Sequence, residues 1–330
     1  MKLILNEKKQ ESKEILHIAC AIDDTFSYPL SVLLVSLFEN NKDHNIKIHL
    51  FSATLSNEII EELNELTDLY NQQFIFYKIQ KKFIFNDLPI NQRISIAAYY
   101  RLLIPEIICP FVERYLYLDA DIIVVDDISG IFELDLKGKV FGAVNDIVGI
   151  EKRFHIKHNI PENYLYFNSG VLLVDKTAWL KTNVTNRTFD YLDNNKGICK
   201  YHDQDALNGA LFMERYFLPP IWNQLIDIYY IPKKILLKSY SYNEIIDALN
   251  QPRIIHFNGP EKPWNFDTGH PFANKFYFYS KKVKGYKKIQ KWNYSKKTIV
   301  YSLFGWKNIN KFYYYKNLLD KPEENIESII

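Results

Sequence analysis

The first eighty residues alternate between apolar runs of strand length and segments with a helical period, and this alternation most constrains the fold. Residues 15–22, 46–53 and 74–79 are continuous or alternating apolar runs typical of strands. Between them, Ser27 and Ser56 stand where helix caps are expected, each ahead of an apolar segment with helical spacing. Strands joined by helices of this length predict an open α/β sheet with right-handed crossovers.

Shorter signals of the same kind continue along the chain, with no internal repeat and no low-complexity linker. Helices are predicted at 95–104, ending before Pro105, and from Asp203 to Phe212. Strands are predicted at 115–118, 140–144 and 171–174, and a last apolar segment lies at 254–257. These elements extend the same α/β domain.

Composition excludes several classes of protein. The chain has 330 residues and is 47% apolar, which suits a packed globular protein and not a disordered or fibrous one. Three cysteines without a CxxC pair suit a reducing compartment. No stretch reaches the roughly 18 apolar residues of a membrane span, so we expect a cytoplasmic protein. Neither a GxGxxG motif nor a P-loop is present, so a bound nucleotide would need a metal instead of a glycine nest.

Asp119 and Asp121 flank one alanine where a short apolar strand ends and a second apolar run begins. Carboxylates at the carboxyl end of a strand lie where open α/β sheets bind ligands, and they suit Mg²⁺ or Mn²⁺. The alternative is a solvated turn, because an Asp-x-Asp spacing also arises by chance and recurs at Asp203-Gln204-Asp205. The apolar run on each side favours the metal site.

His256, at the end of the last apolar run, and Lys262, after the turn that follows it, are two more candidates. As a neutral imidazole, His256 could be a third metal ligand, better suited to Mn²⁺ than to Mg²⁺, or it could be a satisfied core histidine. Lys262 could neutralise a leaving diphosphate, where negative charge develops, or it could be an ordinary solvated lysine.

Two acidic segments stand at helix entries. Asp23 and Asp24 either cap the helix that follows them or contact a base or ribose, with Phe26 offering an aromatic face. Asp203 and Gln204 begin a predicted helix, where they either favour the helix dipole or bond sugar hydroxyls.

Six segments occur in an order that resembles a known family. They are ILHIACAIDD, AAYYRLLIPEI, RYLYLDADIIV, YFNSGVLLVD, YHDQDALNGAL and IIHFNGPEKPW. Together they resemble the bacterial retaining glycosyltransferases of family 8, close to the lipopolysaccharide α-galactosyltransferases and α-glucosyltransferases and more distantly glycogenin. The resemblance covers about residues 15–265, and six ordered motifs are far more specific than any one of them.

The resemblance implies an α/β fold of the GT-A type, with a mixed, mostly parallel central sheet flanked by helices. It also implies a UDP-hexose donor and Mn²⁺, with Mg²⁺ as the alternative ion. Asp119, Asp121 and His256 match the metal ligands of the family. The segment that matches UDP contacts consists of Ala21, Ile22, Asp23, Asp24, Thr25 and Phe26, joined by Ala120, Gly259 and Lys262. The positions that match donor-sugar contacts are Arg101, Asn168, Asp203 and Gln204.

The resemblance further implies transfer with retention of anomeric configuration. Gln204, Asp203 and Lys262 are the catalytic candidates, and Asp146 lies where the acceptor would approach. The amide of Gln204 is a poor nucleophile, which favours front-face departure and attack over a covalent intermediate on Asp205 or Asp146.

One departure concerns the nucleotide base. Many relatives read Asp-Asp-Asn-Tyr where this chain reads Asp23-Asp24-Thr25-Phe26. Phe26 can still stack on uracil, but it lacks the tyrosine hydroxyl.

The C-terminal part is basic and aromatic. Residues 268–319 contain twelve lysines and no acidic residue, in a chain whose net charge is only +2, so the remainder is acidic. We interpret residues 266–330 as a membrane-proximal extension, following a leader at 1–14 and a catalytic domain at 15–265. Lysines on lipid phosphates and Trp and Tyr at the interface would bind an anionic inner membrane surface. One alternative is a solvated helix with buried aromatic residues, and another is nucleic-acid binding, which we do not expect.

The sequence therefore predicts a UDP-sugar-dependent hexosyltransferase. It moves galactose or glucose to a glycan or lipid-linked glycan, with a lipopolysaccharide or lipooligosaccharide core as the preferred acceptor. The alternative enzyme acts on a protein, a capsular polymer or a teichoic polymer. The alternative class is a non-catalytic binder of nucleotide sugar or nucleic acid. We expect the protein to be peripheral on the inner face of the cytoplasmic membrane.

Overall fold

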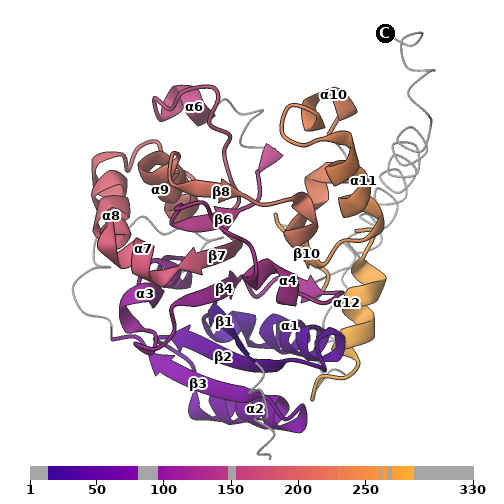
Figure 1. The fold of residues 1–330 in the computed structure, drawn as a ribbon. Coiled ribbons are helices and arrows are strands. Elements are labelled where there is room, and N and C mark those ends of the chain that lie inside the picture. The colour runs from indigo at the N-terminus through magenta and orange to yellow at the C-terminus, as the bar shows by residue number, and fades with distance from the viewer. Residues whose placement is uncertain are drawn as a thin grey trace, which may run out of the picture.

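The chain forms two sheets in a computed structural model that describes residues 14–80, 96–147, 154–229, 231–259, 262–265 and 270–285. A seven-stranded sheet has the order β3-β2-β1-β4-β7-β6-β8, and a three-stranded sheet has the order β5-β10-β9 (Figure 1). The predicted leader up to residue 13 and the extension beyond residue 285 lie outside the described residues.

The first half of the large sheet confirms the alternating pattern of the sequence. Its elements are β1 (Ile15–Ala21), α1 (Ser27–Asn40), β2 (Asn45–Ser52), α2 (Asn57–Leu69) and β3 (Gln73–Lys78). The three strands are parallel. Ser56 caps α2 as predicted, because its side chain accepts a hydrogen bond from Ile59 N. Ser27 is instead the first residue of α1, and Asp23 caps the short 3₁₀ turn η1 (Asp24–Phe26) before it.

The second half of the large sheet contains one reversed strand. Its strands are β4 (Arg114–Leu118), β6 (Phe141–Ala143), β7 (Val171–Asp175) and β8 (Arg215–Phe217). β7 is antiparallel to β4 and β6, whereas β4 is parallel to β1 and β8 is parallel to β6. The prediction of a mixed, mostly parallel sheet is thus confirmed. The reversal places the amino end of β7 at the same sheet edge as the carboxyl ends of β1, β4 and β6.

The apolar run after Asp121 leaves the large sheet. It forms β5 (Ile122–Val124), which pairs with β10 (Ile254–His256), and β10 pairs in turn with β9 (Gln224–Leu225). This antiparallel pairing sets His256 opposite Ile122. Residues far apart in the sequence therefore meet beside the acidic triplet.

Alternate residues of the strands enter two different cores. Leu116 and Leu118 pack with α1 and α2 on one face, whereas Tyr115 and Tyr117 pack on the other face. The helices on that second face are η2 (Ile96–Leu102), α3 (Ile104–Ile107), α7 (Lys176–Lys181), α8 (Val184–Asn194) and α9 (His202–Leu211). The helix predicted at 95–104 is thus a 3₁₀ helix, and Pro105 lies in the first turn of α3, where proline is tolerated.

The described part of the chain contains further helical segments. They are α4 (Ser129–Phe132), α6 (Phe154–Lys157), η3 (Pro220–Trp222), η4 (Ile226–Tyr229), α10 (Lys233–Leu236), α11 (Tyr242–Asn250) and α12 (Ala273–Ser280). Among the described residues, none of the helices is both long enough and apolar enough to cross a membrane.

α12, at the start of the predicted extension, packs on the body of the protein. Tyr279 and Phe276 are buried there, and the Tyr279 hydroxyl accepts a hydrogen bond from Asn40 Nδ2 at 2.8 Å. Phe276 also meets Phe257 edge to face. The boundary that we predict at 265/266 stays a prediction, but an experiment that removes the extension must spare α12.

The buried His49, paired with the half-buried His17, makes stability sensitive to acid. His49 Nε2 lies 2.9 Å from His17 Nδ1, and His49 Nδ1 lies 3.0 Å from the Tyr77 hydroxyl. Burial, with smaller contributions from His17 and Lys47, lowers the pKa of His49 from 6.5 to about 3. Unfolding between these pH values therefore takes up a proton, so the free energy of unfolding falls as the pH falls through this window.

We predict that His49→Phe flattens this dependence. The slope of unfolding free energy against pH should decrease by up to about 1.4 kcal/mol per pH unit between pH 6 and 4, because one proton uptake is lost. Guanidinium unfolding at several pH values measures the slope. The hydrogen bonds that the substitution removes change the unfolding free energy itself, whereas the slope reports the number of protons taken up. Equal slopes in both proteins would contradict the prediction.

Candidate metal and sugar-nucleotide site

Asp119 is held at the carboxyl end of β4 by backbone and side-chain contacts. Its N–H donates to Gly170 O at 2.8 Å, which joins it to the amino end of β7. The Tyr117 hydroxyl donates to Asp119 Oδ1 at 2.7 Å. The carboxylate is therefore oriented before any ligand arrives.

Asp121 and His256 meet because β5 pairs with β10. Phe257 N–H donates to Asp121 O at 2.9 Å, and His256 Nε2 lies 3.1 Å from Asp121 Oδ1. One ligand atom each from Asp119, Asp121 and His256 lies within 4.8 Å of the others. Two carboxylates and an imidazole form a donor set that fits Mn²⁺, and the predicted trio is thus brought together.

Lys262 lies against the same carboxylate. Its ammonium group contacts Asp121 Oδ2 and donates to Phe257 O at 2.7 Å. Burial raises the pKa of the Asp121 carboxyl, but Lys262 and then His256 outweigh it and hold that pKa well below its usual value. Asp121 is therefore an anion that can bind a cation at neutral pH.

Arg101 is the buried cation on the other side of Asp119. Its Nη2 lies 3.0 Å from Asp119 Oδ1, and its Nη1 donates to Ser169 O at 2.7 Å. Its Nε lies 3.0 Å from Asp203 Oδ2, but the Nε hydrogen points to Ala98 O, so that pair is an ion pair without a hydrogen bond. Burial raises the pKa of Asp203 to about 6, although Arg101 opposes this effect.

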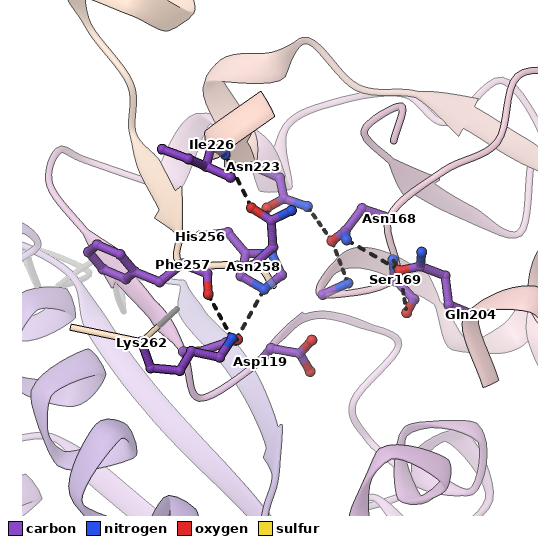
Figure 2. A network of polar contacts seen from close by, with 12 residues as sticks. Asp119, Asn168, Ser169, Gln204, Asn223, Ile226, His256, Phe257, Asn258 and Lys262 are labelled. Atoms are coloured by element: carbon purple, nitrogen blue, oxygen red, sulfur yellow. Dashed lines mark hydrogen bonds and ion pairs between the residues drawn. The ribbon is translucent and has the colours of Figure 1, made fainter. Parts of the chain in front are cut away.

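Three side-chain amides connect the metal trio to α9. Asn223 contacts His256 and Asn168, and Asn168 Nδ2 donates to Gln204 Oε1 at 3.2 Å (Figure 2). Gln204 Oε1 also accepts from Ser169 N–H at 3.0 Å. The predicted donor-sugar residues Asn168, Asp203 and Gln204 therefore lie beside Arg101 and the predicted metal ligands.

The far end of this network reaches the predicted acceptor side. Gln204 Nε2 donates to Asp146 Oδ2 at 3.2 Å and to the Tyr166 hydroxyl at 3.0 Å. The Tyr166 hydroxyl in turn donates to Asp205 Oδ1 at 2.6 Å, and Asp205 Oδ2 accepts from Tyr201 N–H at 2.8 Å. Both oxygens of the buried Asp205 carboxylate thus already accept hydrogen bonds.

The segment predicted to contact UDP follows β1 at the same sheet edge. Asp23 Oδ1 accepts from Thr25 N–H at 3.0 Å, so the helix-entry role that we weighed is present. Ile22 is buried, whereas Asp24 and Thr25 are exposed. The Phe26 ring meets Trp264 edge to face at 6.0 Å, which brings this segment close to the chain just after Lys262.

Ala120 and Gly259 complete the predicted UDP contacts. Ala120 is buried between the two aspartates of the triplet. Gly259 has a φ of +88°, a backbone conformation that only glycine adopts without strain, and a Cβ there would meet no atom within 4 Å. Gly259 therefore allows the backbone conformation of the turn between His256 and Lys262.

Two residues of the site, Gly170 and Asn223, are not among the predicted contacts. Gly170 lies so close to the trio that a Cβ on it would be 2.3 Å from His256 Cε1 and 2.8 Å from Asp119 Oδ2. Asn223 is fully buried between His256 and Asn168. Only the position of Gly170 in the Asn168-Ser169-Gly170 strand entry could have drawn attention to it.

Comparison with known proteins identifies the family of the chain. The family model of glycosyl transferase family 8 matches residues 17–268. General stress protein A of Bacillus subtilis (strain 168) is 31% identical over 275 residues, covering 81% of this chain and 93% of that protein. A lipopolysaccharide 1,2-glucosyltransferase of Escherichia coli (strain K12) is 28% identical over 256 residues, covering 77% of this chain and 74% of that protein.

A solved structure shows the same fold. The galactosyltransferase LgtC, in complex with donor and acceptor sugar analogues, superposes with a TM-score of 0.73 at 24% identity, covering 82% of this chain and 96% of that chain. Fold and sequence together define a glycosyltransferase with the GT-A fold. The chain belongs to glycosyl transferase family 8, as the six motifs predicted.

We predict that Gly170→Ala disables the site but not the fold. The added methyl group would push His256 or Asp119 away, so affinity for Mn²⁺ should fall about 100-fold, a loss typical of disturbed metal surroundings. Mn²⁺ titration followed by electron paramagnetic resonance measures the loss. Gly197→Ala is the matched control, because a Cβ at Gly197 meets no atom within 4 Å. An unchanged affinity in Gly170→Ala would contradict the prediction.

Proposed function

We propose that this protein is a retaining hexosyltransferase that moves galactose or glucose from a UDP-sugar to a glycan. The observation that carries the proposal is the Asp119, Asp121 and His256 trio beside Arg101 and Gln204 at one sheet edge. Lipopolysaccharide core is the preferred acceptor, because the relative from Escherichia coli is named for that substrate class. A protein, capsular or teichoic acceptor remains the alternative, and family membership argues against a non-catalytic binder.

Asp119, Asp121 and His256 would hold Mn²⁺, or Mg²⁺ in its place. When bound, such an ion neutralises the charge of the donor diphosphate and of the departing UDP. Lys262 would supply a second positive charge at the same place, because its ammonium lies at the Asp121 carboxylate. Ala21 to Phe26, Ala120 and Gly259 would contact the nucleotide from the same edge.

The contacts of Gln204 support a front-face reaction. Its Oε1 already accepts hydrogen bonds from Asn168 and Ser169, so it has little capacity to attack an anomeric carbon. Asp205 is equally engaged by Tyr166 and Tyr201. We therefore assign Gln204 and Asp203 to holding the donor sugar. Asp146, bonded to Gln204 Nε2, would face the acceptor hydroxyl.

We predict that Asp119→Asn and Asp121→Asn each abolish metal-dependent turnover with little loss of folding. Each change removes one anionic ligand and keeps the size of the side chain. Release of UDP from UDP-galactose and from UDP-glucose, with Mn²⁺ or Mg²⁺, measures turnover and also identifies the donor. Asp135→Asn is the control, because Asp135 is an exposed carboxylate paired with Lys137. Near-normal activity of either site variant would refute the metal assignment.

We also propose that the extension binds an anionic membrane surface from the cytoplasmic side. Lys282 and Lys284, at its start, are paired with Glu39 and Glu65 of the body. Most lysines of the extension belong to residues 286–330, which lie outside the described part of the chain, and the proposal assigns the lipid phosphates to these cations.

A truncation after residue 285 tests this proposal and keeps α12. The full chain should co-sediment with vesicles that contain anionic lipid, and less so as salt increases, whereas the truncated chain should stay in solution. UDP release by both proteins is the control for folding. Equal partitioning of the two proteins would rule out membrane binding by the extension.

A further inference from the structure

Asn223 is a fully buried amide between the predicted metal ligand His256 and the predicted sugar contact Asn168. Its Oδ1 lies 3.1 Å from His256 Nδ1, and its Nδ2 lies 2.9 Å from Asn168 Oδ1. It follows the short helix η3, and Figure 2 shows it between His256 and Asn168.

Backbone N–H donors determine how the side-chain amides of Asn223, Asn168 and Gln204 are oriented. A backbone N–H can only donate, and Gly170 N–H points at Asn168 Oδ1 at 2.9 Å, which identifies that atom as oxygen. Ser169 N–H identifies Gln204 Oε1 in the same way. Asn223 must therefore present its NH₂ group to Asn168, and its oxygen faces His256.

This orientation decides which nitrogen of His256 carries hydrogen. Asn223 Oδ1 can only accept, so His256 Nδ1 is the donor. In the neutral form of the ring, the lone pair is then on Nε2. That nitrogen lies 3.1 Å from Asp121 Oδ1. The lone pair of Nε2 and the carboxylate oxygen repel each other, and a cation bound to both would remove this repulsion.

We propose that Asn223 is a positioning residue of the metal site, which holds His256 as the Nδ1–H tautomer with Nε2 directed to the metal. The inference rests on the metal assignment of the proposed function. Asn223 also contacts Asn168, which donates to Gln204 Oε1 and so leaves Gln204 Nε2 directed to Asp146. One buried side chain thus orients both a predicted metal ligand and a predicted donor-sugar contact.

The test measures tautomer and metal affinity in the absence of donor. Long-range ¹⁵N–¹H spectra of histidine-labelled protein without metal report the tautomer, and the His256 signal is the one missing in His256→Gln. Mn²⁺ binding is measured by electron paramagnetic resonance.

Two substitutions of Asn223 separate its two contacts. Asn223→Leu keeps the volume but removes both polar contacts, whereas Asn223→Asp keeps the acceptor for His256 Nδ1–H and removes the donor to Asn168. Asn41→Leu is the control, because Asn41 is a buried amide whose hydrogen bonds go to the backbone of residues outside the site.

We expect an Nδ1–H signal for His256 in the wild type, in Asn41→Leu and in Asn223→Asp, and its loss in Asn223→Leu. The dissociation constant for Mn²⁺ should rise about 10- to 100-fold in Asn223→Leu only. An Nε2–H tautomer in the wild type would overturn the proposal without any variant. Wild-type affinity in Asn223→Leu would overturn it as well. If His256→Gln binds Mn²⁺ normally, the metal assignment fails. If that variant loses Mn²⁺ and Asn223→Leu does not, only the role of Asn223 fails.

Discussion

The buried guanidinium of Arg101 is the interaction on which the site depends. It comes from η2, and it lies against Asp119 after β4, Ser169 before β7 and Asp203 on α9. A charge taken out of water is stable only when it is paired, so these segments cannot separate without leaving an uncompensated ion. The planar fork of arginine can bind several oxygens at once, which a lysine would not do equally well. One cation thus joins the predicted metal ligands to the predicted sugar contacts.

The reversed strand β7 brings the second half of the site to the same edge. Because β7 begins where β4 ends, Gly170 lies against Asp119 and His256, and Asn168 and Ser169 lie against Gln204. A glycine is needed there because any side chain would occupy the space of the imidazole. The antiparallel direction of β7 is therefore a functional feature as well as a topological one. A fully parallel sheet would place this strand entry at the opposite edge.

Much of this could be predicted from sequence because the signals are local. The strands β1, β2 and β3 and the cap Ser56 follow from periodicity and side-chain chemistry within a few residues. Other features could not be predicted in this way. The apolar run after Asp121 looks like a continuation of β4, but it joins a different sheet, and Ser27 looks like a cap although Asp23 forms the preceding turn. The first outcome depends on packing partners that a local pattern does not contain. The second depends on a local contact, in which Asp23 accepts from Thr25 N–H and takes the capping role in place of Ser27.

The sequence by itself determined the α/β class, the order of the elements, the family and the acidic triplet. Only the tertiary structure decided which groups meet that triplet. Lys262 is 141 residues from Asp121, and Asn223 is 33 residues from His256 and 55 from Asn168. Periodicity reports which face of an element is buried, whereas contacts over such separations depend on how strands pair and in which direction. For that reason the triplet was visible in the sequence, and the amide that orients its histidine was not.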